Sequence, residues 1–515
     1  MSEFFKASIK HNASIRRDRR LHKLDDDIGV SIMDLANLPN ETSIFTEVAA
    51  EERPASSCTI RPNSTAALNG SWALSPLAPP SFSSAASRPA VPIQLHLSSA
   101  MLYLDHVFPF LFPFYQPPLI ETGRQWLLGL LCQNDVSFHL ASSLSAYFFS
   151  LVQNDGHTHD DCRDIVWNKL IEQMDLALSS IQNSISETRG TLLDKIRVMQ
   201  DIGQFLVVEV IVRTEADWMI HLTPAMCLFD EIFARHEPKG SPSSITALLQ
   251  ALPSGIPPHI VHHKSLPNTA DQSALIFFAS LLLFVDIIAS TALGSTPSLR
   301  KHHSLLSDLR LENVVGCQTW VLEAIASTSA LCAWKQDAKE RDKLSFFQLI
   351  RLANPISTSL EKGLAELDSL PSLTKPRLSA YYALGHVDRE RVIATKIWAN
   401  AALIYLSVSV FGWQVNNVDV QSSISRVLSL VENIDSPAQL RSLSWPLCIV
   451  GSMASTEQEQ SFRRIATGRG ALDRFGTLST ALCIMEAIWN SIDVDRSDWE
   501  ISTALNVLGS PALLF

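Results

Sequence analysis

The chain has 515 residues and 46% of them are hydrophobic, so it carries enough apolar material for a large core. Its formal net charge of −11 excludes a globally basic nucleic-acid-binding protein, and any contact with DNA would have to be local. The eight cysteines form no CxxC pair, which favours reduced, mostly buried thiols of an intracellular protein over a disulfide scaffold.

The first part of the chain, residues 1–36, is rich in charged side chains, and its densest basic run extends from Arg16 to Lys23. Short clusters of Lys and Arg contact phosphates and act as nuclear-import signals. The candidate nuclear-import or phosphate-contacting residues are Arg16, Arg17, Arg19, Arg20 and Lys23. Ordinary solvated surface is an equal alternative, because Asp18 interrupts the run and three aspartates follow it closely. No apolar leader precedes the run, so we do not expect secretion.

Residues 37–94 are rich in Ser, Pro, Ala, Asn and Thr. Such a segment has little apolar surface to bury against the entropic cost of ordering, and its prolines remove backbone donors. The composition therefore predicts a disordered Ser/Pro-rich linker. A large helical domain is expected to follow it over residues 95–515.

An aromatic-rich segment from Leu102 to Tyr115 opens that domain. Because proline disfavours helical geometry in the residue before it, Pro109 and Pro113 should each end or kink the helix. Further along, stretches rich in Pro, Gly, Ser or His predict loops at about 238–272, 294–310 and 352–385.

Long stretches of the domain have apolar residues at steps of three and four, the spacing of one helix face. In one of them Asp160 or Asp161 can cap the start, and the apolar face is Trp167, Leu170, Ile171, Met174, Leu178 and Ile181. Similar patterns predict helices at roughly 192–212, 273–293, 311–335, 389–411, 421–432 and 478–490. No alternating apolar and polar segment lies between hairpin turns. The sequence therefore predicts an all-α fold.

The most apolar stretch, Leu275 to Leu293, nearly reaches the ~20 residues that a membrane-spanning helix needs. An ionisable side chain at membrane depth is costly, and Asp286 lies inside the stretch. A helix that is apolar on all sides is also what the centre of a large helical domain requires. We therefore predict a core helix and no association with a membrane.

Few residues suggest a metal-binding or catalytic site. The cluster from His157 to Cys162 could supply metal ligands only with further partners, and a polar loop is the favoured interpretation. The pairs within His262–Lys264 and Lys301–His303 are expected to be solvated surface. HExxH, GxxxxGK[ST] and GxGxxG motifs are absent. We therefore predict no catalytic, cofactor-binding or metal-binding residue and no enzymatic activity.

Several blocks of the helical region occur together in a definite order. They are Tyr103–Tyr115, Gly123–Leu128, Leu144–Tyr147, Ala274–Ser290, Glu312–Trp320, Ala333–Lys335, Phe411–Gln414, Ser444–Cys448 with Gly451, Arg474–Gly476 and Trp499–Gly509. From about residue 95 to the end, the chain resembles the fungal-specific transcription factor domain of the acriflavine-sensitivity-control type. The aromatic residues of these blocks, Trp126, Trp320, Trp413, Trp445 and Phe475, are expected to be core residues rather than ligand contacts.

The resemblance implies a helical domain that serves regulation, effector response or dimerisation in a nuclear transcription factor. Such proteins usually carry six cysteines spaced C-x2-C-x6-C…C-x2-C-x6-C, which hold two zinc ions and place a helix in the major groove. Here Cys58 is the only cysteine before Cys132. This sequence therefore lacks the ligands of a binuclear zinc cluster, and we expect no cofactor.

Two functions follow from the resemblance. The first is a nuclear transcription regulator of specialised-metabolite or toxic-compound response genes, with a small-molecule effector as a candidate ligand. The alternative is a helical interaction protein that binds no DNA itself and pairs, as a homo- or heterodimer, with full-length zinc-cluster regulators. DNA would then be reached indirectly or through an unrecognised surface. A zinc cluster encoded by an upstream exon would return the chain to the first class.

Overall fold

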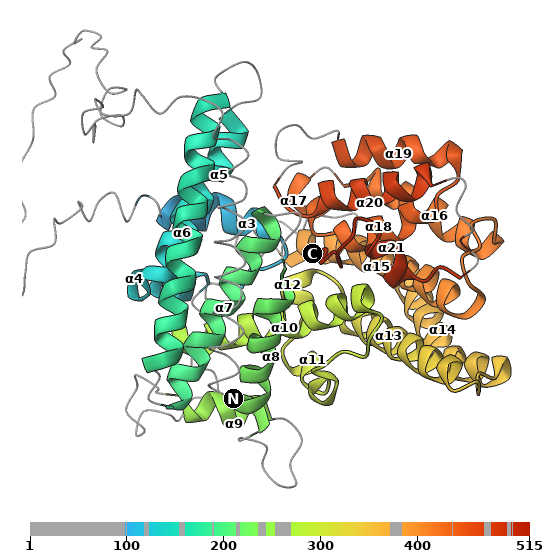
Figure 1. The fold of residues 1–515 in the computed structure, drawn as a ribbon, viewed down its shortest axis with the longest axis horizontal. Coiled ribbons are helices and arrows are strands. Elements are labelled where there is room, and N and C mark those ends of the chain that lie inside the picture. Colours follow the sequence, from blue (N-terminus) through green and yellow to red (C-terminus); the bar gives the residue numbers. More distant parts are fainter. Residues whose placement is uncertain are drawn as a thin grey trace, which may run out of the picture. The chain divides into compact units, whose positions relative to one another are not determined.

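All regular structure in the described part of the chain is helical, which confirms the predicted all-α fold (Figure 1). The computed structural model describes residues 98, 100–117, 123–153, 160–187, 190–212, 217–234, 244–252, 269–370, 384–434, 436–467, 475–491, 496 and 498–515. The charged segment 1–36, with its basic run from Arg16 to Lys23, and the linker at 37–94 lie outside the described residues. The prediction of a disordered linker and the proposed roles of the basic run therefore stay predictions.

The first long helices pack against their neighbours in the sequence. They are α4 (Gln125–Gln133), α5 (Asp135–Gln153), α6 (Asp160–Glu187), α7 (Leu192–Val212), α8 (Met219–Ala234) and α9 (Ser244–Ala251). α5 packs on α6, α6 on α7, and α7 on α8, and α5, α6 and α7 run side by side in Figure 1. The predicted face of α6 is confirmed, because Leu170, Met174, Leu178 and Ile181 are buried.

The remaining helices build the other part of the described domain. They are α10 (Ala270–Leu293), α11 (Leu305–Asp308), α12 (Glu312–Val315), α13 (Thr319–Glu340), α14 (Phe346–Ser369), α15 (Leu384–Phe411), α16 (Val418–Val431), α17 (Pro437–Arg441), α18 (Ser444–Ser452), α19 (Thr456–Thr467), α20 (Leu478–Asn490) and α21 (Ile501–Leu505). α10 connects the two parts. It contacts α4, α7 and α8, which precede it in the chain, and α13 and α21, which follow it.

α10 is the core helix that the sequence predicts. Thr269 and Gln272 form a capping box at its start, and Gly294 ends it in the left-handed conformation. Both α10 and the 389–411 part of α15 are long and apolar enough to cross a membrane. However, 94% and 72% of their most apolar windows are buried inside the protein.

The carboxylate within α10 has an internal role. Asp286 is buried and accepts hydrogen bonds from the backbone N–H groups of Ser298 at 3.0 Å and Leu299 at 2.8 Å. Burial raises the pKa of Asp286 to about 6, and the two backbone hydrogen bonds act in the opposite direction. The side chain therefore fixes the turn that follows its own helix.

Of the two prolines expected to end or kink the first helical segment, only Pro113 lies just beyond a helix end. A short π-helix, η1 (Tyr103–Val107), leads without a break into α3 (Phe108–Leu111), so Pro109 does not end the helix. Pro109 directly follows the change from π-helical to α-helical hydrogen bonding, at which the Phe108 N–H group donates to the Tyr103 carbonyl five residues earlier. The helix ends before Pro113, as predicted.

The predicted loop at 352–385 is wrong over its first part, because α14 continues through Pro355 to Ser369. A proline inside a helix leaves the carbonyl group four residues earlier without its donor. Here that residue is Arg351, which lies on the exposed side of α14, where water can take the place of the donor. Leu349 and Leu360, on the buried side, hold both halves of the helix in place.

Short helices occupy two other predicted loops, with α9 inside 238–272 and both η4 (Arg300–His302) and α11 inside 294–310. The helix predicted at 311–335 is divided at Gly316, between α12 and α13. Gly316 has a φ of +80°, and a Cβ atom there would lie 2.2 Å from the Phe114 ring. Only glycine fits both constraints.

We expect the substitution Asp286→Ala to lower the free energy of unfolding by about 2 to 5 kcal/mol, because two buried N–H groups lose their acceptor. Urea denaturation monitored by circular dichroism measures this change. Asp498→Ala, at a highly exposed aspartate, is the control. Equal stability of the two variants would contradict the assigned role of Asp286.

Candidate ligand pocket

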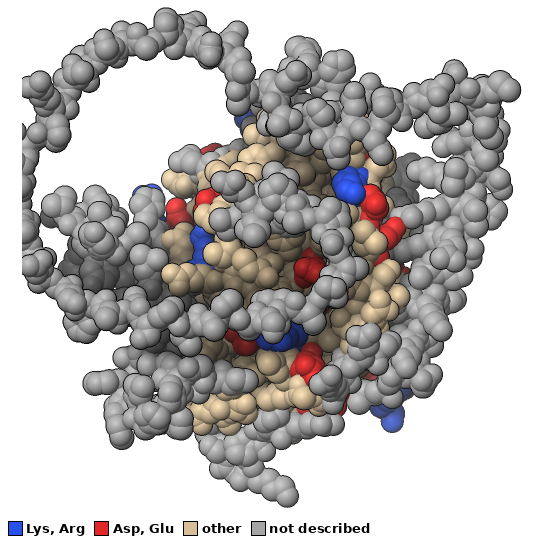
Figure 2. All heavy atoms as spheres, turned by 90° about the vertical axis from the view of Figure 1, so that its left-hand side faces the viewer, with Lys and Arg blue, Asp and Glu red and all other residues tan. Residues whose placement is uncertain are grey.

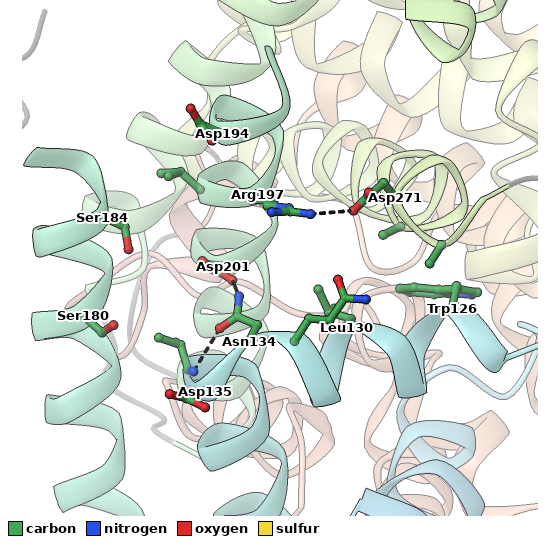
Figure 3. Close-up of a pocket in the computed structure, with 15 residues that line it drawn as sticks. Trp126, Leu130, Asn134, Asp135, Ser180, Ser184, Asp194, Arg197, Asp201 and Asp271 are labelled. Carbon is green, nitrogen blue, oxygen red and sulfur yellow. Dashed lines mark hydrogen bonds and ion pairs between the residues drawn. The ribbon is translucent and has the colours of Figure 1, made fainter. Parts of the chain in front are cut away.

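A hollow of about 470 Å³ lies between α4, α5, α6, α7 and α10, and we call it the α4–α10 pocket. Its lining residues are Trp126, Leu130, Gln133, Asn134, Asp135, Val136, Ser180, Ser184, Asp194, Arg197, Val198, Asp201, Ala270, Asp271 and Ala274. Figure 3 shows Ser180 and Ser184 on one side of the pocket and Trp126 on the other. The volume is within the usual range of small-molecule sites, roughly 300 to 1,000 Å³.

Three of the four lining aspartates belong to helix starts. Asp135, Asp194 and Asp271 lie in the first turns of α5, α7 and α10. A helix N-terminus carries a partial positive charge that stabilises a carboxylate, so these positions have a structural reason to be acidic.

The fourth aspartate, Asp201, has no such reason, because it lies well inside α7. It is only 7% exposed, and its Oδ1 accepts a hydrogen bond from Asn134 Nδ2 at 2.5 Å. The Oδ1 atom of Asn134 caps α5 by accepting from the N–H groups of Val136 and Ser137. Asp201 thereby orients the cap of α5.

Burial raises the pKa of Asp201 to about 7, although the Asn134 hydrogen bond and the charge of Arg197 act in the opposite direction. Arg197 is the only cation among the described lining residues. It already forms an ion pair with Asp271 at 3.6 Å (Figure 3). The pocket therefore contains a buried carboxylate whose charge is not matched by a cation of its own.

The opposite wall is apolar. Trp126 is almost fully buried, which confirms that it is a core residue, yet its ring also borders the pocket. Its Nε1 donates a hydrogen bond to the Tyr115 hydroxyl at 2.9 Å, which fixes the indole in place. Leu130 and Ala274 extend this surface. The pocket thus combines an acidic side with a flat apolar side.

A second hollow, of about 320 Å³, lies over α15 between α14 and α16, and we call it the α14–α16 groove. Apolar side chains around it are unusually exposed, with Phe347 at 80% and Val418 at 81%. Phe346 and Phe411 are also exposed and contact each other. Phe347 and Val418 belong to the first turns of α14 and α16, the two helices that flank the groove.

The histidine pair at 302 and 303 is not the solvated surface that the sequence predicts. His302 is buried, and its Nε2 lies 2.8 Å from Asp230, which also pairs with Lys301 at 2.5 Å. Burial, with smaller contributions from Arg300 and His302, lowers the pKa of His303 to about 4. Lys301 and His302 thus attach η4 to α8 through Asp230. The polar clusters at 157–159 and 262–264 lie outside the described residues, as do the side chains of Asp160 to Cys162.

The described cysteines are all unpaired, but only half are buried. Cys317, Cys332 and Cys448 are buried, whereas Cys132, Cys227 and Cys483 are exposed. No group of three or more His, Cys, Asp or Glu in the described residues is placed to hold a metal ion. Among the described atoms visible in Figure 2, basic and acidic side chains are interspersed.

Comparison with known proteins gives one family match, to the fungal specific transcription factor domain, over residues 99–506. Transcription factor dibT of Pestalotiopsis microspora is 51% identical over all of this chain and 91% of its own length. A trichothecene biosynthesis transcription regulator of Trichoderma arundinaceum is 26% identical over 73% of this chain and 87% of its own. Pestheic acid cluster transcriptional regulator 3 of Pestalotiopsis fici is 23% identical over 76% and 70%. No solved structure gives a significant match.

The pocket leads to a prediction about pH. The ordinary pKa of an aspartate is 3.8, and that of Asp201 is about 7. Between these values the folded protein holds a proton that the unfolded chain has released, so stability falls as the pH rises from about 4 to about 7. The charged groups that share the pocket are Asp135, Asp194, Arg197 and Asp271.

We expect Asp201→Asn to lose this part of the pH dependence, of which about 3 kcal/mol falls between pH 5 and pH 8. Chemical denaturation at about pH 5 and about pH 8 measures it. Asp194→Asn, at a less buried carboxylate of the same pocket, is the control. A wild-type pH dependence in the Asp201→Asn variant would contradict the prediction.

Proposed function

Because the chain belongs to the fungal-specific transcription factor domain family, we propose that it is a nuclear regulator of specialised-metabolite genes and that a small effector binds in its α4–α10 pocket. The family match over residues 99–506 is the observation that carries the regulatory role. The specialised-metabolite role is supported by two relatives named for a biosynthetic pathway or a metabolite cluster. Response to toxic compounds is the other regulatory role that this family suggests.

The pocket supports binding rather than catalysis. Its described lining residues include no histidine, cysteine or lysine, and its aspartates have structural roles, three at helix starts and Asp201 at the cap of α5. A concave site with an apolar wall and a few convergent polar groups is the usual form of a small-molecule binding site. We therefore assign the pocket to an effector and the chain to the non-enzymatic regulators.

The route to DNA has two candidate forms. In one, the chain contacts DNA through a surface of its own. In the other, it pairs with a zinc-cluster regulator that has the same helical domain. The exposed apolar side chains beside the α14–α16 groove favour the second form, because they provide a surface on which another protein's domain packs.

Nuclear accumulation tests the proposed location. We expect replacement of Arg16, Arg17, Arg19 and Arg20 by alanine to shift a fluorescently tagged full chain from the nucleus towards the cytosol, because import receptors bind clustered cations. Replacement of four exposed cations of the helical domain, Lys169, Lys339, Arg341 and Lys362, is the matched control. Cytosolic retention of the unaltered chain would contradict the nuclear assignment.

Chromatin occupancy tests the proposed partner. We expect the double variant Phe347→Ser and Val418→Ser to co-purify about tenfold less with the zinc-cluster regulator and to lose promoter occupancy in parallel. Its thermal stability should change little, because both side chains are exposed. Ile165→Ser with Leu176→Ser, which alters two exposed apolar residues of α6, is the control. Occupancy that no such partner affects would favour direct DNA binding.

A further inference from the structure

The α4–α10 pocket has a chemical preference that follows from Asp201. The other lining aspartates lie at helix starts, where the helix stabilises their charge. Asp201 is buried inside α7, and the one lining cation, Arg197, is paired with Asp271. The charge of Arg197 therefore offsets the burial of the Asp201 carboxylate only in part, and a cation placed next to this carboxylate would offset more.

Two further buried polar side chains belong to the same region of α5 and α7. The Ser137 hydroxyl approaches the Asp201 carboxylate and helps to lower its pKa, although the contact falls short of ideal hydrogen-bond geometry. One turn beyond Asp201 on α7, Gln204 donates from Nε2 to the Ser137 carbonyl, while its Oε1 has no partner. Both side chains are more than nine-tenths buried. Ser137 and Gln204 do not line the pocket, so a donor that enters it meets the Asp201 carboxylate itself.

Three helix starts around a pocket would ordinarily favour an anion. Here a capping side chain already accepts one or two N–H groups at each of the three starts. Asn134 accepts those of Val136 and Ser137, Thr191 accepts that of Asp194, and Thr269 accepts that of Gln272. The first-turn aspartates would also repel an anion. The helix starts therefore do not provide an anion site.

We propose that the effector is a small protonated amine, whose ammonium group reaches Asp201 and whose apolar part packs on Trp126 and Leu130. An ammonium group has three N–H donors and no acceptor, which suits a buried lining carboxylate that forms no ion pair with the described residues. The apolar part fits the flat wall that the Trp126 indole forms, and the volume admits a metabolite-sized molecule. This proposal rests on the pocket being an effector site.

Phenethylamine is the probe, added to the purified full chain, with phenethyl alcohol and hydrocinnamate as its neutral and anionic analogues. We expect phenethylamine to raise the unfolding temperature by several degrees at saturation, and the two analogues to leave it unchanged. Spermidine, which has more charge and no aromatic ring, is expected to act more weakly than phenethylamine. Equal stabilisation by the alcohol or hydrocinnamate, or a stronger effect of spermidine, would overturn the assigned chemistry.

Two variants locate the site. Asp201→Asn is expected to weaken binding about tenfold or more. It keeps an oxygen that can accept from Asn134, so the α5 cap is retained. Ser180→Lys places an ammonium group inside the pocket, since Ser180 lines it from α6. We expect this variant to unfold at a higher temperature than the wild type and to gain nothing from phenethylamine.

Proton release is a further readout, because a bound cation favours the ionised form of Asp201. At about pH 6.5, we expect the calorimetric binding enthalpy of phenethylamine to vary with the ionisation enthalpy of the buffer in the wild type but not in Asp201→Asn. Full affinity of Asp201→Asn for the amine, or no binding of amine by the wild type, would overturn the proposal. Promoter occupancy is measured separately, so the regulatory role can stand while the amine assignment fails.

Discussion

A helix that is apolar on every side is stable in water only if other helices cover every side, and α10 imposes this requirement on the described domain. α4, α7, α8, α13 and α21 all contact it. Enclosure removes its polar groups from water, so each needs an internal partner. Asp286 accepts two backbone N–H groups, and Thr291 accepts a hydrogen bond from the Trp445 indole at 2.9 Å. The resemblance of α10 to a membrane helix is a consequence of its central position.

Apolar periodicity predicts the long helices well, because burial of one helix face is a local property of the sequence. It predicts interruptions less well, because these depend on residues that are distant in the chain. Pro355 lies within α14 because packed residues on both sides hold the helix together. Gly316 ends α12 because Phe114, from the start of the domain, occupies the space of a Cβ atom. The local sequence around Pro355 does not predict that the helix continues, and the local sequence around Gly316 does not predict that the helix ends.

No sequence motif predicts the α4–α10 pocket, because its residues come from five helices that meet only in the folded protein. Trp126 is predicted as core and is buried, but a core residue can also form the wall of a pocket. The available signal was an aspartate in the apolar part of α7, at position 201, where neither a helix start nor an exposed face explains a charge. The same reasoning applies to Asp286, which proved to be structural. Only the surrounding geometry separates the two cases.

The pocket and the core helix meet at the start of α10. Asp271, in its first turn, pairs with Arg197 of α7 at the pocket, and α10 continues from there to its contacts with α13 and α21. A ligand that competes for either charge therefore acts on a helix that touches both parts of the domain. A buried helix moves as a unit when it moves at all, because close packing resists gradual deformation. α10 is thus the helix that lines the pocket and also contacts the second part of the domain.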